Sequence, residues 1–92
     1  MTRVPHLFEL GNIYTTPGVL ESVIHDDIPA ALARHQSGDW GDVDADDKRE
    51  NAFALGRRLR LLSAYHSSNG VKFWIITEAD RSSTTVLLPS EY

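Results

Sequence analysis

Three apolar runs in the second half of the chain, separated by very short turns, limit the possible folds more than any other feature. The runs RRLRLLSAYHS, VKFWIITEA and TTVLLP are rich in β-branched and aromatic residues, and SNG and DRSS stand between them. Asn, Gly, Ser and Asp favour tight turns, and strands joined by such short turns are antiparallel neighbours. The sequence therefore predicts a three-stranded antiparallel meander over residues 57–89.

The register of the first hairpin decides which side chains share a face, because a one-residue shift turns every side chain over. A two-residue turn would mix polar and apolar residues on both faces. A three-residue loop at 68–70 places Tyr65 opposite Phe73 and segregates the faces. It also places Arg60 opposite Glu78. One face then carries an apolar set for helices to cover: Leu59, Leu61, Tyr65, Phe73, Ile75, Val86 and Leu88.

The opposite face of this sheet is predicted to be neither a polar solvent face nor an apolar core. It combines an apolar strip with charged side chains and a tryptophan, and its members are Arg58, Arg60, Leu62, His66, Lys72, Trp74, Ile76, Glu78, Thr85 and Leu87. Such a face is either covered by further chain or serves as a binding surface. Trp74 is therefore a candidate contact with a partner.

The beginning of the chain predicts a strand followed by a short helix. Residues 8–15, FELGNIYT, are rich in β-branched and aromatic types, so we expect an edge strand with a bulge at Gly11. Thr16 followed by Pro17 is a strong helix start. The apolar spacing in this helix predicts that four side chains point inward: Val19, Leu20, Val23 and Ile24.

Two further helices are expected before the meander. One starts at Asp27 and ends near Gly38, and the other runs from about Asp44 to Leu55 and stops at Gly56. The predicted fold is α+β, with an N-terminal strand and two to three short helices packed on an antiparallel meander of three or four strands. The whole chain, residues 1–92, forms a single domain in this interpretation.

Composition limits the classes of function. Ninety-two residues are too few for an enzyme that carries its own cofactor fold, and the absence of cysteine excludes disulfides and thiolate metal sites. The net charge of −4 disfavours nucleic acid and anionic membranes as partners. Without a signal-like or membrane-spanning apolar stretch, the expected location is the cytoplasm, and we expect no cofactor and no metal.

The segment HQSGDWGDVDADD, residues 35–47, is unusually acidic. Asp44 is placed to cap the third helix, and Asp46 and Asp47 fall in its first turn, where the helix dipole favours negative charge. A calcium loop starting at Asp42 has the right alternation of carboxylates, but it lacks the central glycine and the closing glutamate. Capping is therefore the favoured interpretation over a metal site or a mimic of a phosphate backbone.

Capping does not account for Asp39 and Asp42, which flank Trp40. A loop tryptophan is either an anchor for a partner or a lid that folds back on the core. The turn that contains Arg81 also has two interpretations, because its hydroxyls and cation could hold a phosphate or a partner carboxylate or could serve only as turn chemistry. Asp39, Trp40, Asp42, Trp74 and Arg81 are the candidate partner-binding residues.

One set of residues has the chemistry of an enzyme. Glu78, His66, Arg58 and Arg60 share a face in the predicted register. A carboxylate, an imidazole and guanidinium groups are what metal-free RNA cleavage needs. The competing interpretation is a cross-strand ion pair between Arg60 and Glu78 and a solvated His66.

The motifs GDWGD and ITEADRS, followed by TTVLLP and EY, form a specific combination. With Arg34-His35, Asn51 and Ser63-Ala64-Tyr65 they resemble a family of small, functionally uncharacterised bacterial proteins of plasmids, prophages and integrated mobile elements. The likeness extends from about Gly11 to Tyr92. It implies a mobile-element accessory protein.

Two functional hypotheses follow from the sequence. The first is a non-enzymatic interaction module that inhibits a host defence system by binding a protein or by blocking a nucleic-acid site, with a protein as the expected partner. The second is a small metal-independent ribonuclease or toxin that uses Glu78, His66, Arg58 and Arg60.

Overall fold

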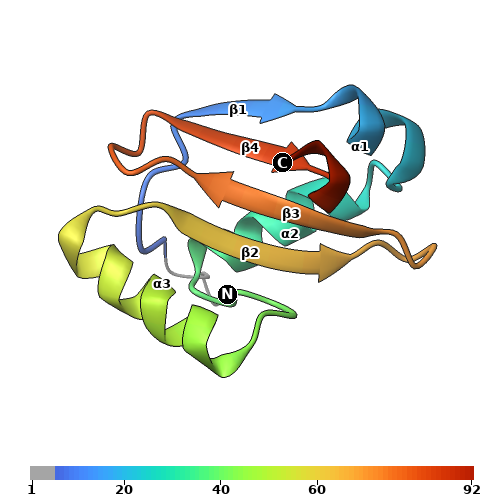
Figure 1. Ribbon diagram of the computed structural model, residues 1–92. Helices are drawn as coiled ribbons and strands as arrows, with labels where there is room; N and C mark the ends of the chain where they lie inside the picture. Colours follow the sequence, from blue (N-terminus) through green and yellow to red (C-terminus); the bar gives the residue numbers. More distant parts are fainter. Residues whose placement is uncertain (1–5) are drawn as a thin grey trace, which may run out of the picture.

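Four strands form one sheet in the order β1-β4-β3-β2 in the computed structural model, which describes residues 6–92 (Figure 1). The predicted antiparallel meander is present as β2 (Leu61–His66), β3 (Lys72–Thr77) and β4 (Ser83–Leu87). The N-terminal strand, β1 (Asn12–Thr15), lies at the edge beside β4, but it pairs with β4 in parallel. A parallel neighbour needs a long crossover, and the chain between these two strands supplies it. The fold is α+β with a mixed, mostly antiparallel sheet.

The predicted register of the first hairpin is confirmed. Tyr65 lies opposite Phe73 and Ser63 opposite Ile75, and Gly70 takes the left-handed conformation at φ 88°. The Ser67 N–H donates to the Val71 carbonyl at 2.9 Å and closes the turn. The alternation of apolar residues and the turn chemistry thus lead to the same pairing.

The helices within residues 6–92 are α1 (Pro17–Ser22), α2 (Asp27–Gln36), α3 (Ala45–Arg57) and the 3-10 helix η1 (Pro89–Glu91). Helices α1 and α3 begin directly after the predicted caps, whereas Asp27 is the first residue of α2 and the preceding Asp26 makes no side-chain cap hydrogen bond. The Thr16 hydroxyl accepts from the Val19 N–H at 3.3 Å, and the Asp44 carboxylate accepts from the Asp47 N–H at 2.8 Å. None of the described helices is both long enough and apolar enough to cross a membrane.

Two predicted boundaries are wrong. Gly56 is helical rather than a stop, and α3 continues to Arg57, followed by the C-cap Arg58, which takes the left-handed conformation at φ 53°. The first strand begins at Asn12 rather than at Phe8, and Gly11 precedes it with φ 65°. A Cβ on Gly11 would lie 2.3 Å from the Ser82 carbonyl oxygen, so the glycine allows close approach to the turn before β4 rather than a bulge.

The core forms on the sheet face that α1 and α2 cover (Figure 1). One hydrophobic cluster contains Val19, Val23, Ala31, Tyr65, Phe73, Ile75 and Val86, and a second contains Phe8, Trp40, Ala54 and Leu61. Three residues expected inside are exposed instead, namely Leu20, Ile24 and Leu59. Helix α1 has only six residues and buries a single narrow side through Val19, while Leu59 lies in the linker before β2.

A buried polar chain crosses this core. His35 is fully buried, and hydrogen bonds join its Nδ1 to the Ser63 hydroxyl at 2.5 Å and its Nε2 to the Thr77 hydroxyl at 2.8 Å. Thr77 continues to Thr84 at 2.8 Å, and the Thr84 hydroxyl donates to the Leu10 carbonyl at 2.7 Å. Burial lowers the pKa of His35 to about 3, so the ring is neutral at physiological pH.

Candidate functional site

Residues 39–42, the DWGD segment, cover the outer edge of β2. The Trp40 carbonyl accepts from the Ala64 N–H at 3.1 Å, and the Asp42 N–H donates to the Ala64 carbonyl at 2.7 Å. This parallel bridge extends the sheet by a short piece beyond β2. Unpaired strand edges invite pairing with other chains, so the segment protects this edge.

The side chains of this segment face different ways. Asp39 accepts two hydrogen bonds from Arg34, at 2.7 and 3.2 Å, and these bonds hold the pKa of Asp39 below its usual range. Trp40 is 7% exposed and stacks on Phe8. It therefore seals the core and is not presented to a partner. Asp42 remains on the surface, with its carboxylate 3.5 Å from His66 Nδ1.

Gly41 is the residue that allows the close approach, which leads to a prediction about stability. Its φ is 75°, and a Cβ there would lie 2.2 Å from the Ala64 carbonyl oxygen. Gly41→Ala is expected to lower the free energy of unfolding by about 2–5 kcal/mol, from backbone strain and overpacking together. Gly70→Ala is the matched control, because Gly70 is also left-handed at φ 88° but has open space around it. Equal losses of unfolding free energy for both variants in urea denaturation would contradict the close approach of Gly41 to the Ala64 carbonyl.

Asn51 completes the cover over β2, and the sequence did not reveal this role. Its side-chain amide donates to the Leu62 carbonyl at 2.7 Å and accepts from the Leu62 N–H at 3.1 Å. The amide thus replaces one residue of a neighbouring strand. The available signal was an uncharged polar residue in a charged helix, which does not separate a buried Asn from a solvated one.

Arg81 is a structural residue rather than an exposed binding residue. It is 8% exposed and left-handed at φ 62°, and its guanidinium donates to four backbone carbonyls, those of Leu59, Glu78, Ala79 and Ala54. The turn around it follows the simpler interpretation, since the Asp80 carboxylate accepts from the Ser82 N–H at 3.0 Å. The Arg81 cation is therefore not available for a phosphate or a partner carboxylate.

The residues proposed for RNA cleavage are not brought together. Arg60 and Glu78 form an ion pair of 3.1 Å at one end of the β2–β3 hairpin, whereas His66 lies six residues further along, beside Asp42. Six residues of strand span about 20 Å. Arg58 donates to the Asp80 carbonyl at 3.2 Å. Sharing a sheet face did not make these four residues neighbours, so they form no single acid-base site.

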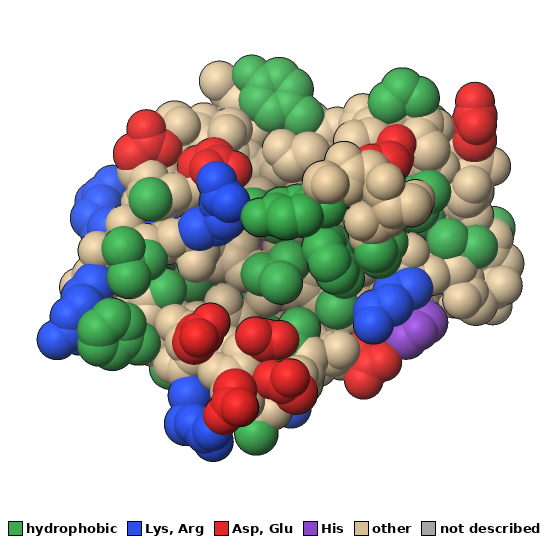
Figure 2. All heavy atoms as spheres, viewed as in Figure 1, with side chains coloured by type: hydrophobic (Ala, Val, Ile, Leu, Met, Phe, Trp, Pro, Cys, Tyr) green, Lys and Arg blue, Asp and Glu red, His purple; other side chains and the backbone are tan. Residues whose placement is uncertain are grey.

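The sheet face opposite α2 remains as a candidate binding surface. Figure 2 shows hydrophobic side chains gathered along its centre, with charged groups at both ends. We call it the open face, and its apolar members are Leu62, Ala64, Trp74, Ile76 and Leu87. Leu62 and Trp74 are half-buried, and the other three form a buried floor.

The last turn of the chain folds over part of the open face. The Tyr92 ring meets the Trp74 ring edge to face at 5.7 Å, and the Tyr92 hydroxyl accepts from Arg60 at 3.2 Å. Glu91 fixes this turn, because its carboxylate accepts from the Thr16 hydroxyl at 2.6 Å and from the Leu88 N–H at 2.8 Å. Tyr92 itself is 72% exposed, so the turn adds aromatic surface to the open face.

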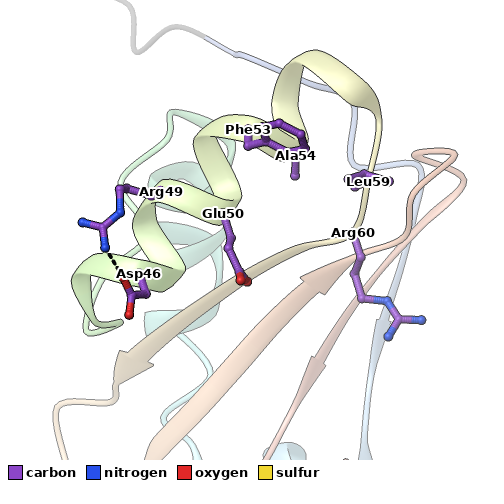
Figure 3. A pocket seen from close by; sticks show the side chains of 7 residues that line it. All are labelled: Asp46, Arg49, Glu50, Phe53, Ala54, Leu59 and Arg60. Atoms are coloured by element: carbon purple, nitrogen blue, oxygen red, sulfur yellow. Dashed lines mark hydrogen bonds and ion pairs between the residues drawn. The ribbon is translucent and has the colours of Figure 1, made fainter.

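A groove of about 650 Å³ adjoins the open face at Arg60 (Figure 3). It lies between α3 and the chain that leads into β2, and its lining is Asp46, Arg49, Glu50, Phe53, Ala54, Leu59 and Arg60. Phe53 and Leu59 are about half exposed, and Asp46 pairs with Arg49. Within residues 6–92, no group of three or more His, Asp or Glu side chains is arranged to hold a metal ion.

Comparison with protein-family models, with curated proteins and with solved structures finds no match. The resemblance to mobile-element proteins therefore stays a prediction from the sequence motifs.

Proposed function

We propose that this chain is a non-enzymatic interaction module that binds a protein through the open face. The observation that carries this proposal is the Trp74–Tyr92 aromatic pair on a sheet face that α1 and α2 leave uncovered. An apolar centre with an aromatic anchor and a charged rim is the usual composition of a protein-binding patch. The rim consists of the Arg60–Glu78 pair at one end and Lys72, His66 and Asp42 at the other.

A protein partner is favoured over nucleic acid by the state of the arginines. Among residues 6–92, Arg34, Arg49 and Arg60 each pair with a carboxylate, Arg58 and Arg81 donate to backbone carbonyls, and Arg57 lies over the Phe53 ring. With a net charge of −4 in addition, the chain offers little attraction to a phosphate backbone. Asp42 and Trp74 stay in the proposed contact surface, while Asp39, Trp40 and Arg81 support the fold.

The biological role that we propose rests on the sequence resemblance alone. The chain would be a cytoplasmic accessory protein of a mobile element that inhibits a host defence system by occupying a surface of one of its proteins. GDWGD and ITEADRS are the motifs that support this role.

Affinity capture from the host tests the proposed surface. Trp74→Ala is expected to weaken capture of the partner at least about tenfold, because aromatic anchors at interface centres contribute about 2 kcal/mol or more. The matched control is Leu20→Ala, which also removes an exposed apolar side chain, 51% exposed and on α1. Capture should survive nuclease treatment and be unchanged in the control. Equal capture by wild type and Trp74→Ala, at equal thermal stability, would contradict the proposal.

A further inference from the structure

The two edges of the sheet are treated differently. The β2 edge is covered twice, by Asn51 at Leu62 and by residues 40–42 at Ala64. At the other edge, β1 pairs with β4 on one side, and the described part of the chain places no further strand on its other side. Within residues 6–92, one edge is therefore closed and the other is open.

The outward backbone groups of β1 can be assigned from its ladder. The Asn12 N–H donates to the Ser82 carbonyl at 3.0 Å, and the Thr16 N–H donates to the Val86 carbonyl at 3.1 Å. Backbone groups alternate along a strand, so Asn12 and Tyr14 face β4, whereas Ile13 and Thr15 direct their N–H and C=O groups outward.

The side chains of this edge lack the devices that usually block strand pairing. Asn12–Thr15 contains no charged residue and no proline, although the whole chain carries a net charge of −4. Ile13 is 49% exposed, Tyr14 56% and the nearby Leu20 51%. Hydrophobic side chains are visible in Figure 2 along the edge that β1 and α1 form. An uncharged, apolar edge is self-complementary, because two copies can meet there without bringing like charges together.

We propose that β1 pairs antiparallel with β1 of a second copy of this chain, across a two-fold axis at Tyr14. In this register Ile13 of each copy exchanges backbone hydrogen bonds with Thr15 of the other, so all the outward groups of both strands are paired. Registers centred on Ile13 or Thr15 would need Gly11, at φ 65°, or Pro17 to continue the ladder. The two Tyr14 side chains then lie directly opposite each other in a non-hydrogen-bonded pair.

The dimer would present its binding surfaces together. Tyr14 is in register with Thr85, and Thr85 with Ile76, so Tyr14 lies on the same face as Trp74. The two-fold axis is perpendicular to the joined sheet, and both open faces point the same way. A partner that is itself a two-fold dimer, or that carries two copies of a site, would gain avidity from this arrangement.

Sedimentation equilibrium of the purified chain tests the dimer without any partner. The pairing strand is short, so the interface is small and the dimer is expected to dissociate on dilution. Tyr14→Glu places two carboxylates opposite each other at the axis and should weaken the dimer at least tenfold. The control, Phe53→Glu, adds the same charge at a similarly exposed aromatic position on α3 and should leave the dimer intact. A wild-type chain that remains monomeric at millimolar concentration would overturn the proposal.

Hydrogen exchange identifies the edge used. In the dimer, the Ile13 and Thr15 amides should become protected as concentration rises, while protection of the Asn12 and Tyr14 amides, which face β4, stays the same. A dimer in which Ile13 and Thr15 remain unprotected uses another surface and would also overturn the proposal. Because no partner is present, this result is independent of the function proposed for the open face.

Discussion

Replacing His35 by alanine is expected to lower the free energy of unfolding by about 3–5 kcal/mol, a large part of the stability of a small domain. The substitution empties the space beside the stacked Phe8 and Trp40 rings, whose centroids lie 5.1 and 5.7 Å from that of the imidazole in edge-to-face contacts. It also leaves the buried Ser63 hydroxyl without the partner that it has at 2.5 Å. Urea denaturation measures the loss. A loss below about 1 kcal/mol, the size expected at a surface site, would contradict a buried, hydrogen-bonded position for His35.

The same residue should make stability depend on pH. The pKa of His35 is lowered from 6.5 to about 3 by burial, so the unfolded chain binds a proton between these values and the folded chain does not. The contribution of His35 to the free energy of unfolding is therefore complete above about pH 6.5 and is lost as the pH falls toward 3. It amounts to about 4–5 kcal/mol over that range.

A non-titrating substitution isolates this contribution. Lowering the pH from about 7 to about 4.5 should reduce wild-type stability by about 2–3 kcal/mol more than that of His35→Gln. Hydrogen bonds also lower the pKa values of four carboxyl groups, those of Asp27, Asp39, Asp80 and Glu91. Their contribution to the free energy of unfolding also falls as the pH is lowered, but it falls equally in both proteins. If the free energies of unfolding of wild type and His35→Gln changed in parallel with pH, His35 would not contribute to the pH dependence and its pKa would not be lowered by burial.

Arg81→Ala is the second large effect, with an expected loss of about 3–5 kcal/mol. The guanidinium joins the end of α3, through the Ala54 carbonyl, to the linker before β2, through the Leu59 carbonyl at 2.6 Å. Hydrogen bonds from a charged donor contribute more than neutral ones, and their loss leaves buried carbonyls unpaired. Arg81→Lys should recover little, because an ammonium group lacks the planar fork that reaches several carbonyls.

Backbone strain can be separated from the loss of these hydrogen bonds. Arg81 is left-handed at φ 62°, so Arg81→Gly should be less destabilising than Arg81→Ala by about 1 kcal/mol. Arg57→Ala is the control for a surface arginine, since its guanidinium lies 4.0 Å from the exposed Phe53 ring, and it should cost less than about 1 kcal/mol. Equal losses of unfolding free energy for Arg81→Ala and Arg57→Ala, measured by thermal and urea denaturation, would contradict the structural role of Arg81.

The parts of the fold that the sequence predicted depend on local chemistry. Asp44 and Thr16 cap helices through contacts three residues away, and the loop at 68–70 sets the hairpin register within its own turn. The parallel pairing of β1 with β4 could not be predicted in this way, because the two strands are far apart in sequence. The C-cap of α3 at Arg58 could not be predicted either, because a non-glycine residue there takes a conformation that favours glycine.

In the candidate site, too, the features that depend on local sequence could be predicted, and those that depend on distant segments could not. The open face was predicted because alternation along a strand places Trp74 and Ile76 on one side. For Trp40 and Arg81 the sequence left two interpretations open, because a sequence does not show whether an aromatic or a cation turns inward when its partners come from distant segments. Alternation along the strands also predicted that Glu78 and His66 share a face, but it does not give their separation, and the two residues lie at opposite ends of that face.

The two tryptophans allow the most direct test of the claim that the partner binds at Trp74 on the open face rather than at Trp40. Trp74 is on the open face and Trp40 is buried in the core against Phe8, so ¹⁵N-labelled indole groups report the two regions separately by NMR. On addition of the captured partner, the Trp74 indole signal is predicted to shift or broaden while the Trp40 signal keeps its position. A change at Trp40 with an unaffected Trp74 would contradict the account.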